Sequence, residues 1–427
     1  MTLAWASRPR FGTRTRAVLF VLFGLLVLNT LPLLSLGAYG VQNIHVHQAL
    51  ALLQGHVHLL FTDPGLNFDI ALVDGVYQCP FPPFPSLLLV PFVALFGESV
   101  RMIPIALALT GLNVVVFTRL LRKLEIEERF IPWLGAAFFL GTPYWGVVRG
   151  ATIGSYWAHV VAVTGILLAL NEAFGRSRGF LIGLFIGISF LSRQLSIYTA
   201  IFLCAVLWLN PRFTSYKQRF GNLLLYGCSF GMAAGVYLLF NWLRFGDPFD
   251  TGYSKWILTD PFMVARWNNY GSFHPWYFFH NFVYMFIQGF HLEFSPPMYL
   301  DKPHVDYFGT SLTFASPFLF IAFQARGKKY LLWAAWTCIT LCLLHALFYF
   351  GNGWVQENGI RYALDFIPML MVLVALGIQR VESKIWKAAI VYSISLNLLA
   401  FSLISFAYDA FISLGSWGKA FGGYLLH

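Results

Sequence analysis

The chain has 427 residues, of which 58% are hydrophobic and only 11% are charged. So few charged residues exclude a soluble globular protein of this length, whose surface needs far more polar groups, and they indicate a polytopic membrane protein. The formal net charge of +10 does not indicate nucleic-acid binding, because the Lys and Arg residues stand in short clusters between apolar segments and form no continuous patch.

A basic segment at residues 1–16 precedes a series of apolar runs that are long enough to cross a bilayer as helices. The first run has no small-residue cleavage site after it, so we expect a retained signal anchor. Eight runs are clear, at residues 17–36, 101–119, 130–147, 155–172, 221–243, 330–350, 361–379 and 385–407. Three shorter runs bring the predicted number of spans to about eleven, at residues 178–192, 195–210 and 310–325.

One further apolar run, at residues 86–97, follows Pro82, Pro83 and Pro85 and contains Pro91. It is too short to cross a bilayer, so we expect an interfacial helix in the first outer loop. The predicted fold is therefore an all-α polytopic bundle that forms a single membrane domain over residues 1–427.

The basic clusters between the predicted spans indicate the orientation of the chain. With the N-terminus in the cytoplasm, most of these clusters fall on the cytoplasmic side, as the positive-inside rule requires. The two long connections, 37–100 and 244–309, then lie outside, together with most of the acids and histidines. We therefore expect the chemistry at the outer face, with both loops lying on the membrane as a platform or lid.

Three arginines, Arg149, Arg193 and Arg361, map to the outer ends of predicted spans. Arginine remains charged when buried and can bind phosphate oxygens through two N–H groups, so their convergence would form a site for a lipid phosphate or diphosphate. Snorkelling of the side chains at helix ends is the alternative. His159, near the start of the fourth clear span, is predicted either to contact this phosphate or an acceptor hydroxyl, or to be a hydrogen-bonded core histidine.

Two carboxylates in the first outer loop, Asp69 and Asp74, are the candidate catalytic residues. A carboxylate at this place could accept the proton of an acceptor hydroxyl as the hydroxyl attacks a lipid-linked sugar. Asp74 precedes Gly75, a pair that is typical of turns, so Asp74 is the second candidate and a turn is its alternative role. A solvated surface position is the alternative for Asp69.

Two H-x-H pairs, His45 with His47 and His56 with His58, could hold a metal only if their segments were strands, and the apolar pattern around them favours a helix. The chain contains no Walker loop, no H-E-x-x-H and no G-x-S-x-G motif. No cofactor and no metal site is implied by these patterns, and a bound divalent ion is left as an open alternative.

Six segments, in this order, resemble segments of the GT-C superfamily of polytopic glycosyltransferases, which includes protein mannosyltransferases and bacterial lipid A aminoarabinose transferases. They are HQALALLQGHVHL, DGVYQCPFPPFPSLLLVPFVALFG, TPYWGVVRGATIGSYWAH, GLFIGISFLSRQ, NWLRFGDPFDTGY and NGIRYALDFIPML. The family usually has an acid immediately after the first span, where this chain has Gln42 and Asn43. The catalytic role is therefore assigned to Asp69, with Asp74 second.

The resemblance implies transfer of a sugar from a polyprenyl-phosphate donor to a glycan, lipid or protein acceptor, at the outer face of a bacterial cytoplasmic membrane. It also implies that an acidic residue of the first outer loop acts as the base, and we assign this role to Asp69. Binding of the donor phosphate is assigned to Arg193, Arg149, Arg361 and His159 from the residues themselves. The expected partners are the donor, the acceptor and membrane lipids, and no nucleic acid. The alternative is a non-catalytic relative that binds or transports a lipid-linked sugar.

Overall fold

The computed structural model of the chain describes residues 43–61, 69–258, 260–293, 297–298, 304–306, 308–352 and 358–411, together with Gly24 and Thr30. Within these residues the elements are α2 (Ile44–Leu53), β1 (Ala71–Val73), β2 (Val76–Gln78), α3 (Phe84–Phe96), α4 (Met102–Lys123), α5 (Ile131–Gly141), α6 (Tyr144–Arg149), α7 (Gly154–Ala173), α8 (Gly179–Phe190), α9 (Ile197–Trp208), α10 (Tyr216–Phe245), α11 (Pro261–Tyr270), α12 (Tyr277–Phe282), β3 (Leu292–Glu293), β4 (His304–Val305), α13 (Leu312–Ala315), α14 (Lys329–Phe348), α15 (Ile367–Gly377) and α16 (Ser383–Phe411). Short 3-10 helices lie at η3 (Gln194–Ser196), η6 (Pro317–Gln324) and η7 (Arg361–Asp365).

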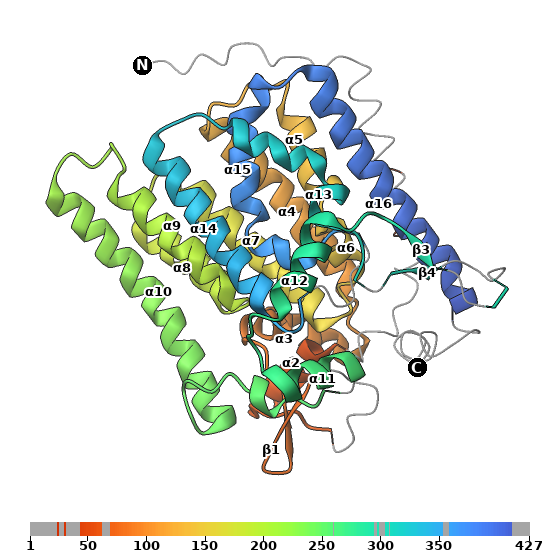
Figure 1. Ribbon diagram of the computed structural model, residues 1–427. Helices are drawn as coiled ribbons and strands as arrows, with labels where there is room; N and C mark the ends of the chain where they lie inside the picture. Colours follow the sequence, from red (N-terminus) through yellow and green to blue (C-terminus); the bar gives the residue numbers. More distant parts are fainter. Residues whose placement is uncertain are drawn as a thin grey trace.

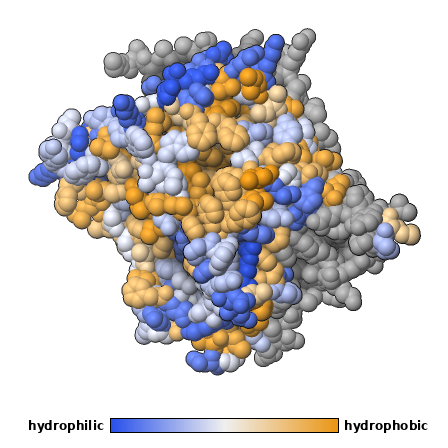
Figure 2. Space-filling view, in the orientation of Figure 1, coloured by the Kyte–Doolittle hydropathy of each residue, from blue (hydrophilic) through white to orange (hydrophobic). Residues whose placement is uncertain are grey.

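The architecture is that of an all-α membrane protein, as predicted (Figure 1). Within the described residues, α4, α7, α10, α14 and the first 20 residues of α16 are long and apolar enough to cross a bilayer. Figure 2 shows hydrophobic residues across the middle of one face, with hydrophilic residues gathered toward the top and the bottom. The predicted number of eleven spans stays a prediction, and the first of them, 17–36, lies almost entirely outside the described residues.

Two apolar runs that were predicted as continuous spans are broken. The run 130–147 divides into α5 and α6, because Thr142 is extended, with φ −116° and ψ 177°, and Pro143 follows it. The run 361–379 begins as the 3-10 helix η7 and becomes the α-helix α15 only at Ile367, with Pro368 in its first turn. Proline restricts the residue before it, and in each run the break lies beside a proline.

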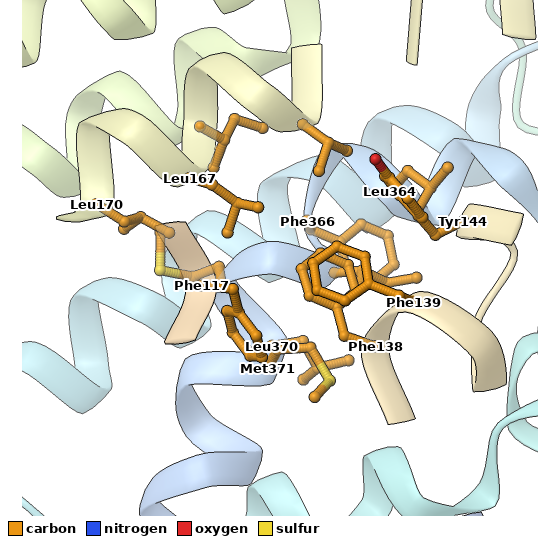
Figure 3. Packing of buried hydrophobic residues seen from close by; sticks show 14 of the residues in the cluster. Phe117, Phe138, Phe139, Tyr144, Leu167, Leu170, Leu364, Phe366, Leu370 and Met371 are labelled. Carbon is orange, nitrogen blue, oxygen red and sulfur yellow. The ribbon is translucent and has the colours of Figure 1, made fainter. Parts of the chain in front are cut away.

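The core surrounds α7, which is buried on nearly every side. Its pattern is apolar all round, as expected of a helix at the centre of a bundle. Figure 3 shows how side chains of α4, α5, α6, α7, η7 and α15 interdigitate in this core. The labelled residues are Phe117, Phe138, Phe139, Tyr144, Leu167, Leu170, Leu364, Phe366, Leu370 and Met371.

Glycine permits the closest helix contacts of the bundle. A Cβ atom at Gly165 of α7 would lie 2.8 Å from the backbone oxygen of Phe185 in α8. A Cβ atom at Gly183 of α8 would collide with the backbone of Tyr226 in α10. Helices in a membrane are not driven together by the hydrophobic effect and associate through such close contacts of small residues. Gly165 and Gly183 therefore allow α8 to pack between α7 and α10.

One end of the bundle is formed by parts of the two long connections, namely α2, α3, β1 and α11 (Figure 1). The strands β1 and β2 form an antiparallel hairpin in which Val73 pairs with Val76. The hairpin is joined to the second connection, because Ala71 forms a bridge with Trp256 and the N–H of Ile257 donates to the carbonyl of Ile70 at 2.8 Å. The two connections thus meet at the same place.

Candidate functional site

A cavity of about 970 Å³ lies where the two long connections meet the ends of α7, α9 and α14. Three of the residues predicted from sequence line it: Asp69, Arg193 and Arg361. Aromatic side chains form much of the remaining wall: Phe81, Tyr156, Phe190, Tyr198, Tyr237, Tyr253, Trp256, Phe273, Tyr349, Phe350 and Tyr362. The site therefore combines these charged side chains with a large apolar surface.

Asp69 stands directly before the bridge that joins the two connections, since Ile70 and Ala71 pair with Trp256 and Ile257. Its backbone is left-handed, with φ 64°. This conformation costs a non-glycine residue about 1–2 kcal/mol, although Asp and Asn adopt it more readily than other residues. The fixed backbone of the adjacent residues therefore holds the carboxylate at the cavity wall.

Burial raises the pKa of the Asp69 carboxyl to about 6, and the nearby Arg361 guanidinium opposes this rise. Desolvation disfavours the charged carboxylate, whereas an opposite charge favours it. A carboxyl group with a pKa close to neutral can accept a proton and release it again near physiological pH. The environment of Asp69 is therefore suited to a general base.

Arg193 lies between α8 and α9 and is held by an acid that was not among the predicted site residues. Its Nε and Nη2 atoms donate to the two carboxylate oxygens of Asp365 at 2.7 and 2.8 Å. The Asp365 side chain is only 2% exposed. This ion pair uses two of the five N–H groups of the guanidinium, so the others can still donate to a ligand, but Asp365 offsets much of the positive charge.

His159 lies behind this ion pair and does not line the cavity. Its Nδ1 atom is 3.9 Å from the Oδ1 atom of Asp365, and neither ring nitrogen has a hydrogen-bond partner in the described structure. The ring also contacts Tyr362 edge-on, with 6.1 Å between the ring centroids. His159 is thus placed to adjust the electrostatics of Asp365 and Arg193, and its predicted direct contact with a substrate is not supported by this position.

Arg361, the first residue of η7, has its guanidinium over the rings of Tyr156 and Tyr362, at 4.9 and 5.0 Å from the ring centroids. These cation–π contacts fix the side chain, which is 8% exposed, at the cavity wall. Arg361 therefore brings a second guanidinium group to the cavity wall, near the Asp69 carboxylate.

Two further predicted site residues, Arg149 and Asp74, also lie outside this cavity. Arg149 packs against α16, with its guanidinium 4.6 Å from the centroid of the Phe401 ring, so the expected convergence of three arginines is reduced to two. Asp74 is exposed at the tip of the β1–β2 hairpin, where Asp74 and Gly75 have φ values of 50° and 79°. Positive φ at both central residues is the signature of a type I′ turn, so Asp74 has its predicted alternative role in the turn.

A second acid of the cavity is Asp260. Its Oδ1 atom accepts the N–H groups of Phe262 and Met263 at 2.9 and 3.4 Å, so it is the N-cap of α11. The sequence Asp260-Pro261 is itself a signal for a helix start, because proline is favoured at the first helical position. Its carboxylate is occupied by this cap and is a weaker candidate for a base than Asp69.

Asn43 occupies a position where the family resemblance would place an acid, and it is fully buried. Its Oδ1 atom accepts the N–H of His45 at 2.9 Å and its Nδ2 atom donates to the carbonyl of Ala151 at 3.1 Å. It is therefore the N-cap of α2 and links α2 to the segment between α6 and α7. Gln42 lies outside the described residues.

The first H-x-H pair lies on α2, as the apolar pattern predicted. The Nδ1 atom of His45 is 2.8 Å from Ser86 Oγ, and the His47 ring packs on Phe61. No group of three His, Cys, Asp or Glu residues in the described part of the chain is arranged to hold a metal ion.

Comparisons of the chain with protein-family models, with curated proteins and with solved structures find no match.

Proposed function

We propose that the chain is a membrane glycosyltransferase that moves a sugar from a polyprenyl-phosphate donor to an acceptor hydroxyl. The observation that supports this proposal is that Asp69, Arg193 and Arg361 line one cavity with largely aromatic walls. A carboxylate can accept the acceptor's proton, guanidinium groups can bind the leaving phosphate, and aromatic walls can contact both a sugar ring and isoprene units. The cavity would open at the outer face, with the N-terminus in the cytoplasm.

In the proposed reaction, the acceptor oxygen attacks the anomeric carbon of the donor sugar from the face opposite the phosphate. Asp69 takes the hydroxyl proton as the new C–O bond forms and the bond from the anomeric carbon to the phosphate oxygen breaks. The electron pair of the broken bond remains on polyprenyl phosphate, whose growing negative charge is stabilised by Arg361 and by the remaining N–H groups of Arg193. The product has the inverted configuration.

The direct test is to incubate the reconstituted protein with a panel of polyprenyl-phosphate sugars and with mixed glycan, lipid and peptide acceptors. Time-dependent release of polyprenyl phosphate together with a glycosylated acceptor would support the transferase. A non-catalytic binder or transporter is the second candidate, because the ion pair with Asp365 offsets the charge of Arg193. Saturable donor binding without release of polyprenyl phosphate, for every donor and acceptor, would support this second candidate.

Arg361→Gln is expected to weaken binding of the donor about 10-fold to 100-fold, because one charge-assisted contact to phosphate is lost. The change should appear in the Kd measured by titrating a fluorescent polyprenyl-phosphate sugar. Arg101→Gln is the matched control, since Arg101 is exposed, belongs to the same predicted outer side and does not line the cavity. Equal weakening in both variants would remove Arg361 from the phosphate site.

The transfer rate is expected to fall about tenfold as the pH is lowered from 7 to 5, because a base with a pKa of about 6 becomes protonated over this interval. The profile of kcat/KM against pH, which reports groups of the free enzyme, is the appropriate measurement. A profile that is flat between pH 5 and 7 would contradict the assignment of Asp69 as the base.

The contribution of Asp69 to the stability of the protein changes with pH in the direction opposite to the transfer rate. Its pKa in the folded protein, about 6, is above the usual value for an unfolded chain, so the folded state binds the proton more tightly. The contribution of this group is therefore most favourable below about pH 4 and is lost as the pH rises through about 6. Thermal melting of Asp69→Asn should lack this part of the pH dependence.

A further inference from the structure

A second cavity, of about 530 Å³, lies at the other end of α7. Tyr156 in the first turns of α7 lines the first cavity, and Glu172 near its last residue lines the second. The rise of an α-helix places these two residues about 24 Å apart, a large part of the thickness of a bilayer core. The second cavity is thus separate from the site described above.

The wall of the second cavity has a large excess of positive charge. It contains Lys123, Arg176, Arg178 and Arg212, with Glu172 as the one acid among its described residues. Both oxygens of Glu172 are used by Arg178, whose Nε and Nη2 atoms donate to them at 2.9 and 3.0 Å. The other three cations form no ion pair within the described residues.

These cations come from three separate segments: the end of α4, the connection from α7 to α8, and the connection from α9 to α10. Like charges in one concave wall repel one another, and a bound anion would relieve this repulsion. Arg119 is also close enough to Lys123 to add to this repulsion. The electrostatic consequence is a site for an anion.

The wall is held in place by part-buried and exposed hydrogen bonds, most of which join one segment to another. Ser177 is 1% exposed. Its hydroxyl accepts a hydrogen bond from Asn210 Nδ2 at 2.7 Å, and its backbone carbonyl accepts one from Asn222 Nδ2 at 2.6 Å. The same Asn210 accepts the backbone N–H of Arg212 at 3.0 Å. Lys123 Nζ donates to the backbone and side-chain oxygens of Asn171 at 2.6 and 2.9 Å. These hydrogen bonds therefore hold the segments that carry the cations in place around the cavity.

We propose that this cavity binds a phosphate group, presented by the headgroup of an anionic phospholipid in the adjacent leaflet. The cations lie at the end of α4 or directly after α7 and α9, which are apolar helices, and phospholipid headgroups lie at such helix ends. Phe174 lines the cavity beside them. Clusters of Lys and Arg directly beyond a membrane span attract anionic lipids in this way. The proposal is independent of any sugar-transfer activity.

The test uses the purified full-length chain in a neutral detergent, with phosphatidylglycerol or phosphatidylcholine added in increasing amounts. Native mass spectrometry measures the lipids that remain bound. Arg176→Gln combined with Arg212→Gln is expected to weaken retention of phosphatidylglycerol about 30-fold and to leave phosphatidylcholine unchanged. Both residues are exposed, and melting curves without lipid check that the double variant is folded.

The matched control is Arg326→Gln with Lys328→Gln, which removes the same charge from another exposed basic segment of the same predicted side. Equal loss of phosphatidylglycerol in both double variants would overturn the proposed site. A third arm titrates inorganic phosphate without lipid. Phosphate that binds at millimolar concentration, competes with phosphatidylglycerol and is lost in the first double variant would support the phosphate site but assign it to a soluble ligand. Failure of phosphate to compete would support the lipid.

Discussion

Asp69→Asn is expected to lower kcat for sugar transfer at least about 100-fold while the protein remains folded and inserted in the membrane. General-base catalysis typically contributes 100-fold to 10,000-fold, and an amide cannot accept the hydroxyl proton. Asparagine has nearly the same shape and tolerates the left-handed backbone that Asp69 adopts, with φ 64°. The loss can therefore be assigned to the carboxylate and not to a displaced loop.

Asp74→Asn is the control for this experiment. Asp74 also has a positive φ and lies in the same connection, but its side chain is exposed at the tip of a hairpin. Asparagine before glycine is favoured in a type I′ turn, so this variant should retain both stability and activity. Full activity of Asp69→Asn would contradict the proposed mechanism, and equal loss in both variants would indicate damage to the first outer loop.

The helices that were predicted well are those whose apolar run is continuous. The runs 101–119, 155–172 and 330–350 correspond to α4, α7 and α14 with ends that differ by only a few residues. Length and hydropathy suffice for such helices, because a long apolar run has few other stable conformations in a membrane. The break between α5 and α6 was missed because apolar residues continue on both sides of Pro143, and hydropathy does not record backbone dihedral angles.

Three residues of the cavity wall were among the predicted site residues. Placing Asp69, Arg193 and Arg361 on one predicted side of the membrane was sufficient to expect them near one another, and they line one cavity. Arg149 was wrongly expected among them, because the face of a six-residue helix that points to the cavity depends on how α16 packs against it. That packing is a tertiary contact between distant segments, so no local pattern could reveal it.

Asp365 was missed for a related reason. It follows Arg361 by four residues in the segment that supported the family resemblance, and the spacing alone would suggest a helical pair with Arg361. The segment instead forms the 3-10 helix η7, and Asp365 pairs with Arg193, which is 172 residues away in sequence. The signal available in the sequence was a carboxylate within an apolar segment, because such a group usually has a charged partner.

Arg193→Ala is expected to lower the free energy of unfolding by about 3–5 kcal/mol, because it leaves the Asp365 carboxylate, 2% exposed, without its partner. The measurement is thermal melting in detergent. Arg122→Ala is the matched control: Arg122 binds Glu128 through the same Nε and Nη2 atoms, but the two side chains are 56% and 32% exposed. Loss of this exposed pair should cost less than about 1 kcal/mol.

Arg193→Gln combined with Asp365→Asn separates the structural role of the pair from its proposed role in phosphate binding. The double variant has no buried charge at this place, so it should melt close to the original protein. Its affinity for a polyprenyl-phosphate donor should nevertheless fall, because the N–H groups that Arg193 still offers to the phosphate are lost. A double variant that is as stable as the original protein and binds the donor equally well would show that the ion pair only joins α8 and α9 to η7, and Arg361 would then be the remaining cation for the phosphate.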